Sequence, residues 1–344
     1  MLPRSQPSTH RLAGPGRRRK VKGVWSSKPP HQSRWHWWLI LIPILAAGLV
    51  ALNIFRTSTW KQNDRFTVVI LNSSSQTVEL VSLDPEADTI SVVRFPPTTQ
   101  VTAVYGYGRY SVSALAHLGE VEGIGNSLMA FSLQEMSGWP VRAVIPDPTT
   151  RRDDLILSRL KLISVRELLR FNKRRLNLFD SWRWFKEVRE SREDKVNIID
   201  IQSPSLSEPV VEPDGMVVYE LKSSSLDTKL RAFAAKSYLK DSFKIAIVNT
   251  THQSGLATHV GHLLANNGLD VIAVSDFPQV NRETRIQVSQ TSFRQTPTGR
   301  LIDSLWPYAV WSTAITDSYR ADIVIHIGQD YLNFLTTKPG RPVL

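Results

Sequence analysis

Gly106-Tyr107-Gly108-Arg109 is the first segment of this 344-residue chain whose residue types suit a phosphate group. Its glycines permit a tight turn, and its arginine carries a permanent positive charge. Arg94, at the end of an apolar run, is a second cation in the same region. Phosphoryl transfer needs such cations and a carboxylate that holds a divalent metal ion. The alternative is that the two glycines serve only a turn, which is their commoner use.

A second segment, the loop Asn249–Gly255, leads from an apolar run into a helical one. The first turn of a helix presents backbone N–H groups that can hold an anion. We therefore take Asn249, Thr251, Ser254 and Gly255 as candidate ligand-binding residues. The alternative is that Asn249 and Thr251 only cap the turn and the helix.

His259 and His262 lie three residues apart, on one face of the helix expected after this loop. No carboxylate lies near them in the sequence, so we expect surface histidines and no metal site. The chain has no cysteine, which excludes disulfides, thiolate catalysis and zinc–thiolate centres. It also lacks a G-x-S-x-G nucleophile motif.

Four motifs resemble, in their order along the chain, the extracytoplasmic catalytic domain of the LytR/CpsA/Psr family. They are SSQT at 74–77, RFPPTT at 94–99, GYGRYSVSA at 106–114 and SGWPVRAVI at 137–145. The resemblance implies a single-pass envelope protein. Such a protein binds a polyprenyl-phosphate lipid and transfers its phosphate-linked glycan to the cell wall with the help of Mg²⁺.

The charged positions of these motifs differ from the family pattern. Gln76 stands where the first motif usually has Asp, and Pro97 and Thr98 stand where the second usually has Arg and Asp. A neutral side chain does not replace a carboxylate as ligand of a hard cation. Arg94 and Arg109 remain as catalytic candidates. We therefore expect a degenerate domain without transferase activity, and Mg²⁺ as a cofactor only if activity is retained.

Residues 243–333 resemble the C-terminal domain that many members of the same family carry, for which no enzymatic role is implied. The matching positions are Ile245, Ile247, Asn249, Thr251, Gly255, Ala257, Leu264, Gly268, Leu269, Val271, Thr284, Ile286 and the run ADIVIHIG at 321–328.

The uncharged run from Trp37 to Phe55 predicts a transmembrane helix, because 19 residues span roughly 28 Å as a helix. Nine Lys and Arg and no acid precede Trp35, which places residues 1–36 in the cytoplasm as a disordered basic tail and the rest outside. A cleaved signal peptide is the competing interpretation. The chain beyond the tail is nearly neutral, with 33 of the 42 Lys and Arg against all 31 acids, so we expect no nucleic-acid partner.

The elements that position these residues form an α/β architecture. Runs at 66–71, 77–83 and 89–94 predict a β-meander, followed by helices at 111–118 and 126–138 and a strand at 141–145. Two amphipathic helices are expected in 151–195, and their apolar stripes cover either the core or a lipid cavity. The apolar positions of the first are Leu160, Ile163, Leu168, Leu169 and Phe171, and those of the second are Leu176, Phe179, Trp182 and Phe185. Residues 243–333 predict the order β-α-β-β-α-β. Residues 202–215, rich in Pro, Gly and Ser, are the first candidate for a domain boundary, and the stretch just before Phe243 is the second. With the second boundary, the chain has a domain at 62–235, a domain at 243–333 and a flexible tail at 334–344.

Three functions fit this organisation. The first is a membrane-anchored, extracytoplasmic envelope protein with a non-catalytic binding or scaffold role in cell-wall assembly. The second is a phosphotransferase that moves a polyprenyl-phosphate-linked glycopolymer onto peptidoglycan, using Arg94 and Arg109. The third is a regulatory or assembly subunit whose basic tail contacts lipid or a partner. The expected partners are the lipid bilayer and either peptidoglycan or a polyprenyl-phosphate lipid.

Overall fold

The computed structural model describes residues 36–56, 58, 60, 64–72, 76–147, 156–166, 178–313 and 319–339. The chain divides into two units, Met1–Val50 and Ala51–Leu344. The basic tail expected at 1–36 lies outside the described residues except for His36.

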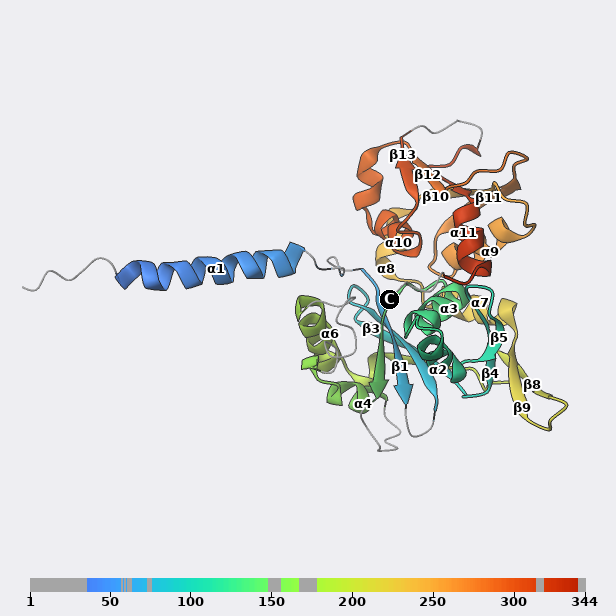
Figure 1. Cartoon of the computed structure of the whole chain (residues 1–344), viewed down its shortest axis with the longest axis horizontal. Coiled ribbons are helices and arrows are strands. Elements are labelled where there is room, and N and C mark those ends of the chain that lie inside the picture. Colours follow the sequence, from blue (N-terminus) through green and yellow to red (C-terminus); the bar gives the residue numbers. More distant parts are fainter. Residues whose placement is uncertain are drawn as a thin grey trace, which may run out of the picture. The chain divides into compact units, whose positions relative to one another are not determined.

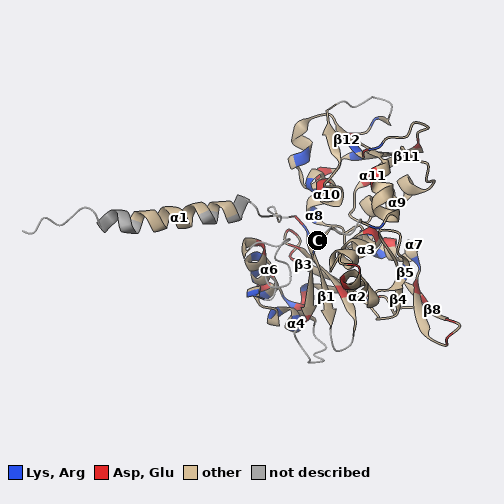
Figure 2. Ribbon diagram, viewed as in Figure 1, with Lys and Arg blue, Asp and Glu red and all other residues tan. Residues whose placement is uncertain are grey.

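Helix α1 (His36–Arg56) forms where the apolar run predicts a helix, and it contains Pro43. The residues from Trp37 to Phe55 in this helix carry no charge, and Figure 2 colours no part of it as Lys, Arg, Asp or Glu. The apolar side chains described along it, such as Leu45 and Leu49, are exposed. Within the described parts of the chain, no helix meets the combined length and hydropathy that a membrane crossing requires.

The first sheet has the strand order β6-β1-β2-β3-β7. The expected meander is confirmed, because β1, β2 and β3 pair antiparallel in sequence order, and the expected strand β6 runs parallel to β1. The strands are β1 (Phe66–Asn72), β2 (Val78–Asp84), β3 (Thr89–Phe95), β6 (Val141–Asp147) and β7 (Val196–Asp200).

Both faces of this sheet are covered by helices (Figure 1). Side chains alternate along each strand, so Val69 points into one core while Val68 and Ile70 point into the other. Helices α2 (Ala114–Val121) and α3 (Ser127–Ser137) close the first core. Helices α4 (Ile156–Leu162) and α6 (Leu178–Glu190) close the second. The result is a three-layer α/β/α sandwich.

The apolar stripe of α6 differs from the expected one. Trp184 and Val188 are buried, whereas Trp182 is 51% exposed. A helix buries positions three to four apart, and the stripe that packs on the sheet is Ser181, Trp184 and Val188. The expected positions Leu168, Leu169, Phe171 and Leu176 lie outside the described residues.

A smaller sheet, with the order β5-β4-β9-β8, flanks the first core. The helix expected from residue 111 begins later, at Ala114, because Gly108–Ser111 pairs with β4 as a strand. The possible boundary at 202–215 lies partly in the β8–β9 hairpin of this sheet. The elements are β4 (Thr99–Ala103), β5 (Gly108–Ser111), the 3₁₀ turn η1 (Glu193–Lys195), β8 (Ser207–Val211), β9 (Val217–Leu221), α7 (Ser223–Ala232) and α8 (Lys236–Asp241).

The third sheet has the order β11-β10-β14-β12-β13, and its elements follow the expected β-α-β-β-α-β order. Three elements were not expected: the 3₁₀ turn η2, the short strand β13 after Pro307, and α11, which covers residues 334–336 of the expected tail. Helices α9, α10 and α11 share one core with this sheet. The bounds are β10 (Lys244–Asn249), α9 (Leu256–Ala265), β11 (Asp270–Asp276), β12 (Arg285–Val288), η2 (Thr291–Gln295), α10 (Pro297–Leu305), β13 (Val310–Ser312), β14 (Ile323–Ile327) and α11 (Gln329–Thr336).

The unit Ala51–Leu344 has two halves, an N-terminal half that contains the first two sheets and a C-terminal half that contains the third. Two glycines allow these halves to approach closely. Gly138 ends α3 with φ +77°, and a Cβ there would lie 2.3 Å from the carbonyl oxygen of Leu263 in α9. Gly106 has φ +71°, and a Cβ there would lie 2.2 Å from the carbonyl oxygen of Thr336 in α11. Neither distance leaves room for a side chain, so both positions require glycine.

Candidate functional site

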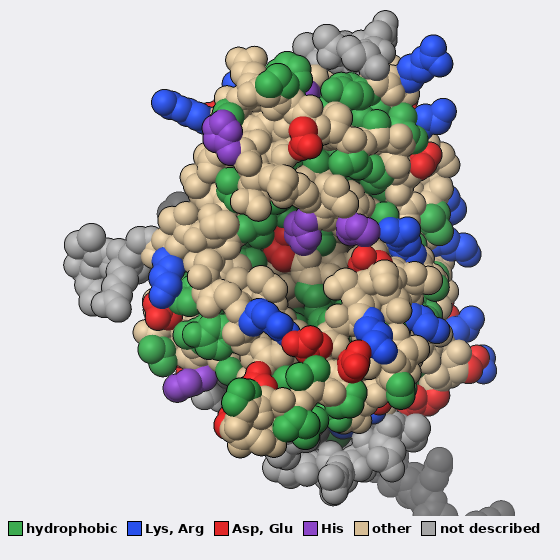
Figure 3. All heavy atoms as spheres, turned by 90° about the vertical axis from the view of Figure 1, so that its right-hand side faces the viewer, with side chains coloured by type: hydrophobic (Ala, Val, Ile, Leu, Met, Phe, Trp, Pro, Cys, Tyr) green, Lys and Arg blue, Asp and Glu red, His purple; other side chains and the backbone are tan. Residues whose placement is uncertain are grey.

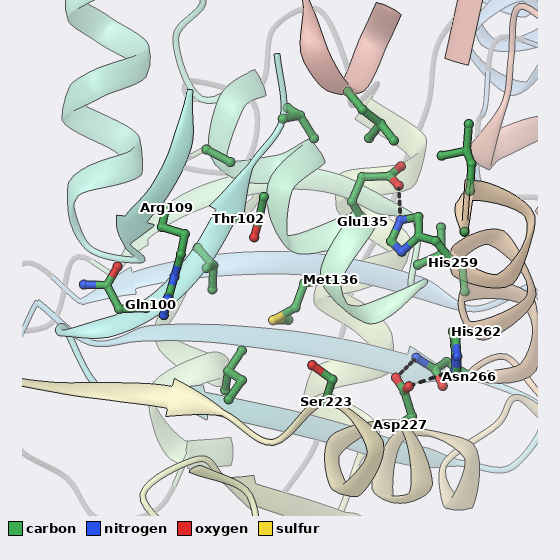
Figure 4. A pocket seen from close by; sticks show the side chains of 18 of the residues that line it. Gln100, Thr102, Arg109, Glu135, Met136, Ser223, Asp227, His259, His262 and Asn266 are labelled. Carbon is green, nitrogen blue, oxygen red and sulfur yellow. Dashed lines mark hydrogen bonds and ion pairs between the residues drawn. The ribbon is translucent and has the colours of Figure 1, made fainter. Parts of the chain in front are cut away.

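A cleft of about 980 Å³ lies between α9 on one side and β4, β5 and α7 on the other. Figure 3 shows this face of the molecule hollowed, with histidine and acidic side chains at the edge of the hollow. In Figure 4, Gln100, Thr102 and Arg109 lie across the cleft from His259 and His262. The cleft is therefore built from segments more than 100 residues apart in sequence.

Two carboxylates from the N-terminal half meet the two histidines of α9 (Figure 4). Glu135 Oε2, on α3, lies 3.2 Å from His259 Nε2 and accepts a hydrogen bond of 2.5 Å from the Tyr331 hydroxyl. Burial and the neighbouring Glu135 raise the pKa of Tyr331 well above its ordinary value. The hydroxyl therefore stays protonated and acts as the donor of this hydrogen bond.

The second pair repeats this arrangement one turn further along α9. Asp227 Oδ2, on α7, lies 3.1 Å from His262 Nδ1. Asp227 Oδ1 accepts a hydrogen bond of 2.7 Å from the Asn266 side chain. The expectation that these histidines lack carboxylate neighbours is wrong, because the neighbours come from helices far away in sequence. Among the residues that the structure describes, no group of three or more His, Cys, Asp or Glu could hold a metal ion.

Arg109 lines the cleft from β5, but it is not an isolated cation. Its Nη2 lies 2.8 Å from Glu220 Oε1 on β9, and both side chains are about half exposed. An exposed pair of this kind contributes about 0–1 kcal/mol and can open for a ligand.

The predicted loop at the start of α9 divides into two parts. Asn249 is 2% exposed, and its Oδ1 accepts hydrogen bonds from the backbone N–H and the hydroxyl of Thr251. Its amide donates to Asp276 and to the Gln253 carbonyl. These two residues therefore hold the turn. Ser254 and Gly255 line the cleft, whereas Asn249 and Thr251 do not. Of the four predicted ligand-binding residues, only Ser254 and Gly255 lie where a ligand in the cleft would touch them.

Two of the four family-like motifs line a separate cavity of about 410 Å³, and a third is hydrogen-bonded to one of them. Gln76 and Thr77 line it from the first motif, and Ser113 and Ala114 from the third. The second motif joins them, because the Ser113 hydroxyl donates a hydrogen bond of 2.8 Å to the Pro97 carbonyl. All the described side chains that line this cavity are uncharged.

Arg94 takes part in a different cluster. Glu79 Oε1, buried on β2, accepts from Arg94 Nε at 3.2 Å and from Arg159 Nη2 at 2.6 Å. Arg159 in turn lies 3.3 Å from Asp147. Arg94 and Arg109 thus belong to separate sheets and to separate ion pairs, and the structure does not bring them to one site.

Asp84 and Asp147, at the ends of β2 and β6, do not suit Mg²⁺. Asp84 accepts hydrogen bonds from the backbone N–H groups of Glu86, Ala87 and Lys236. Asp147 is committed to Arg159. A magnesium site needs carboxylate oxygens that are available in one place, and the described residues do not provide that arrangement.

Sequence reasoning did not identify Glu135, Asp227 or Glu220 as residues of a site. For Glu135 a signal is present, since it is the one acid in a helix whose other positions are largely apolar and buried. A charged residue at such a position needs a specific partner. Asp227 and Glu220 have no comparable signal, because Asp227 lies among polar residues and Glu220 is a half-buried acid at the end of a short strand.

Comparison with known proteins gives one family match. Residues 242–331 match the family model described as LytR cell envelope-related transcriptional attenuator. No curated protein matches the chain.

Solved structures are similar to the chain only at low identity. Bacillus subtilis TagT is 15% identical and covers 50% of this chain and 92% of its own, with a TM-score of 0.34. Bacillus subtilis TagV is 9% identical, with 49% and 95% covered and a TM-score of 0.34. The LytR-CPS2A-psr family protein YwtF (TagT), with bound octaprenyl pyrophosphate lipid, is 15% identical, with 49% and 91% covered and a TM-score of 0.33.

The family match covers the residues for which the sequence predicts a LytR C-terminal-type domain, 243–333, almost completely. The recognition made from the sequence is confirmed there. The chain carries a C-terminal domain of the LytR cell envelope-related transcriptional attenuator family.

Proposed function

We propose that the protein is a cell-envelope component of the LytR/CpsA/Psr type that binds a wall glycan in the cleft between its two halves and does not transfer it. The observation that carries this proposal is the cleft itself. Its volume of about 980 Å³ suits a segment of a polymer. Hydroxyl, amide and carboxylate groups line it together with apolar patches such as Leu221 and Leu263. Sugars need this mixture, because they present hydroxyl groups at their edges and C–H groups on their faces.

A binding role is favoured over glycan transfer by the chemistry of the smaller cavity. Parts of two motifs that resemble a catalytic centre line it, but all the described side chains that line it are uncharged. Arg94 and Arg109, the catalytic candidates, are held by Glu79 and Glu220 in different places. Stabilisation of a transferring phosphoryl group requires several charges aimed at one point.

We further propose that α1 anchors the protein in the cytoplasmic membrane, with both α/β halves outside. Support comes from the uncharged run Trp37–Phe55 and from the nine basic residues that precede Trp35. The exposed Leu and Ile side chains along α1 need apolar surroundings.

Blocking the cleft tests the proposed function. Thr102 is an exposed residue of β4 that lines the cleft, and strands accept aromatic residues (Figure 4). The full chain in detergent should co-sediment with purified peptidoglycan sacculi. Thr102→Trp should raise the apparent dissociation constant about tenfold, equal to 1.4 kcal/mol. Val211→Trp is the matched control, because Val211 is a strand residue that is 68% exposed and lies outside the cleft lining.

Equal sedimentation of the two tryptophan variants would show that the cleft is not where the wall is bound. Release of a lipid-linked phosphate by the unmodified chain would contradict the non-catalytic role, and Arg94→Ala and Arg109→Ala would then show which cation is needed.

A further inference from the structure

The cleft between α9 and the smaller sheet carries a net negative charge. Glu135, Glu220 and Asp227 line it, against the single cation Arg109. With the histidines counted as neutral, the lining is two charges negative. A polymer rich in phosphate would meet repulsion there, because like charges across an interface disfavour binding.

The polar atoms of the cleft also include hydrogen-bond acceptors without donors. Glu135 uses Oε2 for both of its contacts, and among the described residues its Oε1 accepts no hydrogen bond. Asn266 lines the cleft and is fully buried, and its Oδ1 has no hydrogen-bond donor among the described residues. A buried acceptor without a donor costs free energy unless a ligand supplies one. The complement of this lining is a group with several donors and a positive charge.

We propose that the ligand of this cleft is a glycan with free amino groups, in which an ammonium lies between Glu135 and Asp227. This inference rests on the proposed function and specifies its ligand. An ammonium group offers three donors and no acceptor. Its charge compensates the excess of carboxylates, while the sugar hydroxyls bind at Thr102, Ser223 and Ser254.

The experiment compares three probes by isothermal titration with the full chain in detergent. The probes are a glucosamine hexamer, which carries ammonium groups, an N-acetylglucosamine hexamer, which is neutral, and a glycerol phosphate oligomer of similar length. We expect the dissociation constant of the first to be at least about tenfold lower than that of the second. A hydrogen bond that involves a charged group is stronger than one between neutral groups. We expect no binding of the third. This preference should fall with added NaCl, since the cleft is open to solvent.

Asp227→Asn provides the matched variant. It removes the charge but keeps the size of the side chain, so the difference between the two hexosamine probes should shrink about tenfold. Asp303→Asn is the control, because Asp303 forms an exposed ion pair with Arg294 and lies outside the cleft lining. Thermal unfolding of both variants shows whether they are folded.

The outcomes separate the two proposals. Equal binding of the amino and N-acetyl probes, with no effect of Asp227→Asn, overturns the ligand assignment and leaves the glycan-binding function in place. Preference for the glycerol phosphate probe also overturns the assignment. Failure of the chain to bind any probe or sacculi overturns both.

Discussion

Gly106 gives the sharpest test of how the Gly-Tyr-Gly segment is used. The backbone N–H of Gly106 donates to the Leu335 carbonyl at 2.8 Å, and that of Tyr105 donates to the Phe334 carbonyl at 3.1 Å. These bonds join the segment to α11, and the Phe334 ring packs edge-on against the Tyr105 ring. The structure thus uses Gly106 to seat the C-terminal helix, rather than to hold an anion.

The cost of Gly106→Ala follows from three terms. A non-glycine residue at φ +71° costs about 1–2 kcal/mol. The new Cβ would overlap the Thr336 carbonyl oxygen, so the helix end must move away. That movement breaks two backbone hydrogen bonds, each contributing about 0.5–1.5 kcal/mol. We expect a loss of about 2–5 kcal/mol in the free energy of unfolding.

Gly108→Ala is the matched control in the same segment. Gly108 has φ +86°, but a Cβ there meets nothing within 4 Å. Only the conformational term remains, about 1–2 kcal/mol. Urea unfolding of the full chain in detergent, followed by circular dichroism, measures both variants. Gly106→Ala should have the clearly lower midpoint. Equal midpoints would refute the packing role of Gly106.

Two further predictions concern the join between the halves and the membrane topology. Asp64 forms a two-pronged ion pair of 2.5 and 2.6 Å with Arg300 of α10, and the Asp64 side chain is 9% exposed. Asp64→Asn should cost about 2–4 kcal/mol in urea unfolding, near the range for breaking a buried pair. Asp303→Asn, which removes an exposed ion pair, should cost less than about 1 kcal/mol in the same assay. Similar losses of stability in the two variants would contradict this reasoning. A protease-sensitive reporter fused after Leu344 should be cleaved from outside intact cells, whereas cleavage only after lysis would contradict the proposed topology.

Much of the fold could be predicted because it depends on local patterns. The meander of β1 to β3 is encoded in β-branched runs separated by turn residues, and the structure confirms it. Gly138 was predicted to end a helix, and it does so with φ +77°. The order of elements in residues 243–333 follows from the spacing of apolar residues, which is fixed by helix and strand geometry.

The less accurate predictions concern residues whose partners are distant. The predicted apolar stripe of α6 contained Trp182, whereas the observed one contains Trp184. The two residues are equally apolar, so only the position of the sheet decides which of them is buried. Residues 108–111 became a strand because β4 lies beside them. In both cases tertiary contacts override a weak local preference.

The sequence by itself determined the absence of thiol chemistry, the uncharged run at 37–55, the neutral residues Gln76 and Thr98, and the family of the C-terminal domain. Only the tertiary structure decided that Glu135 and Asp227 meet the histidines of α9, and that Gly106 faces a helix end. The physical reason is that residue type and period are properties of a short segment. The charge and hydrogen-bonding capacity of a cleft are sums over segments that come together only when the chain is folded.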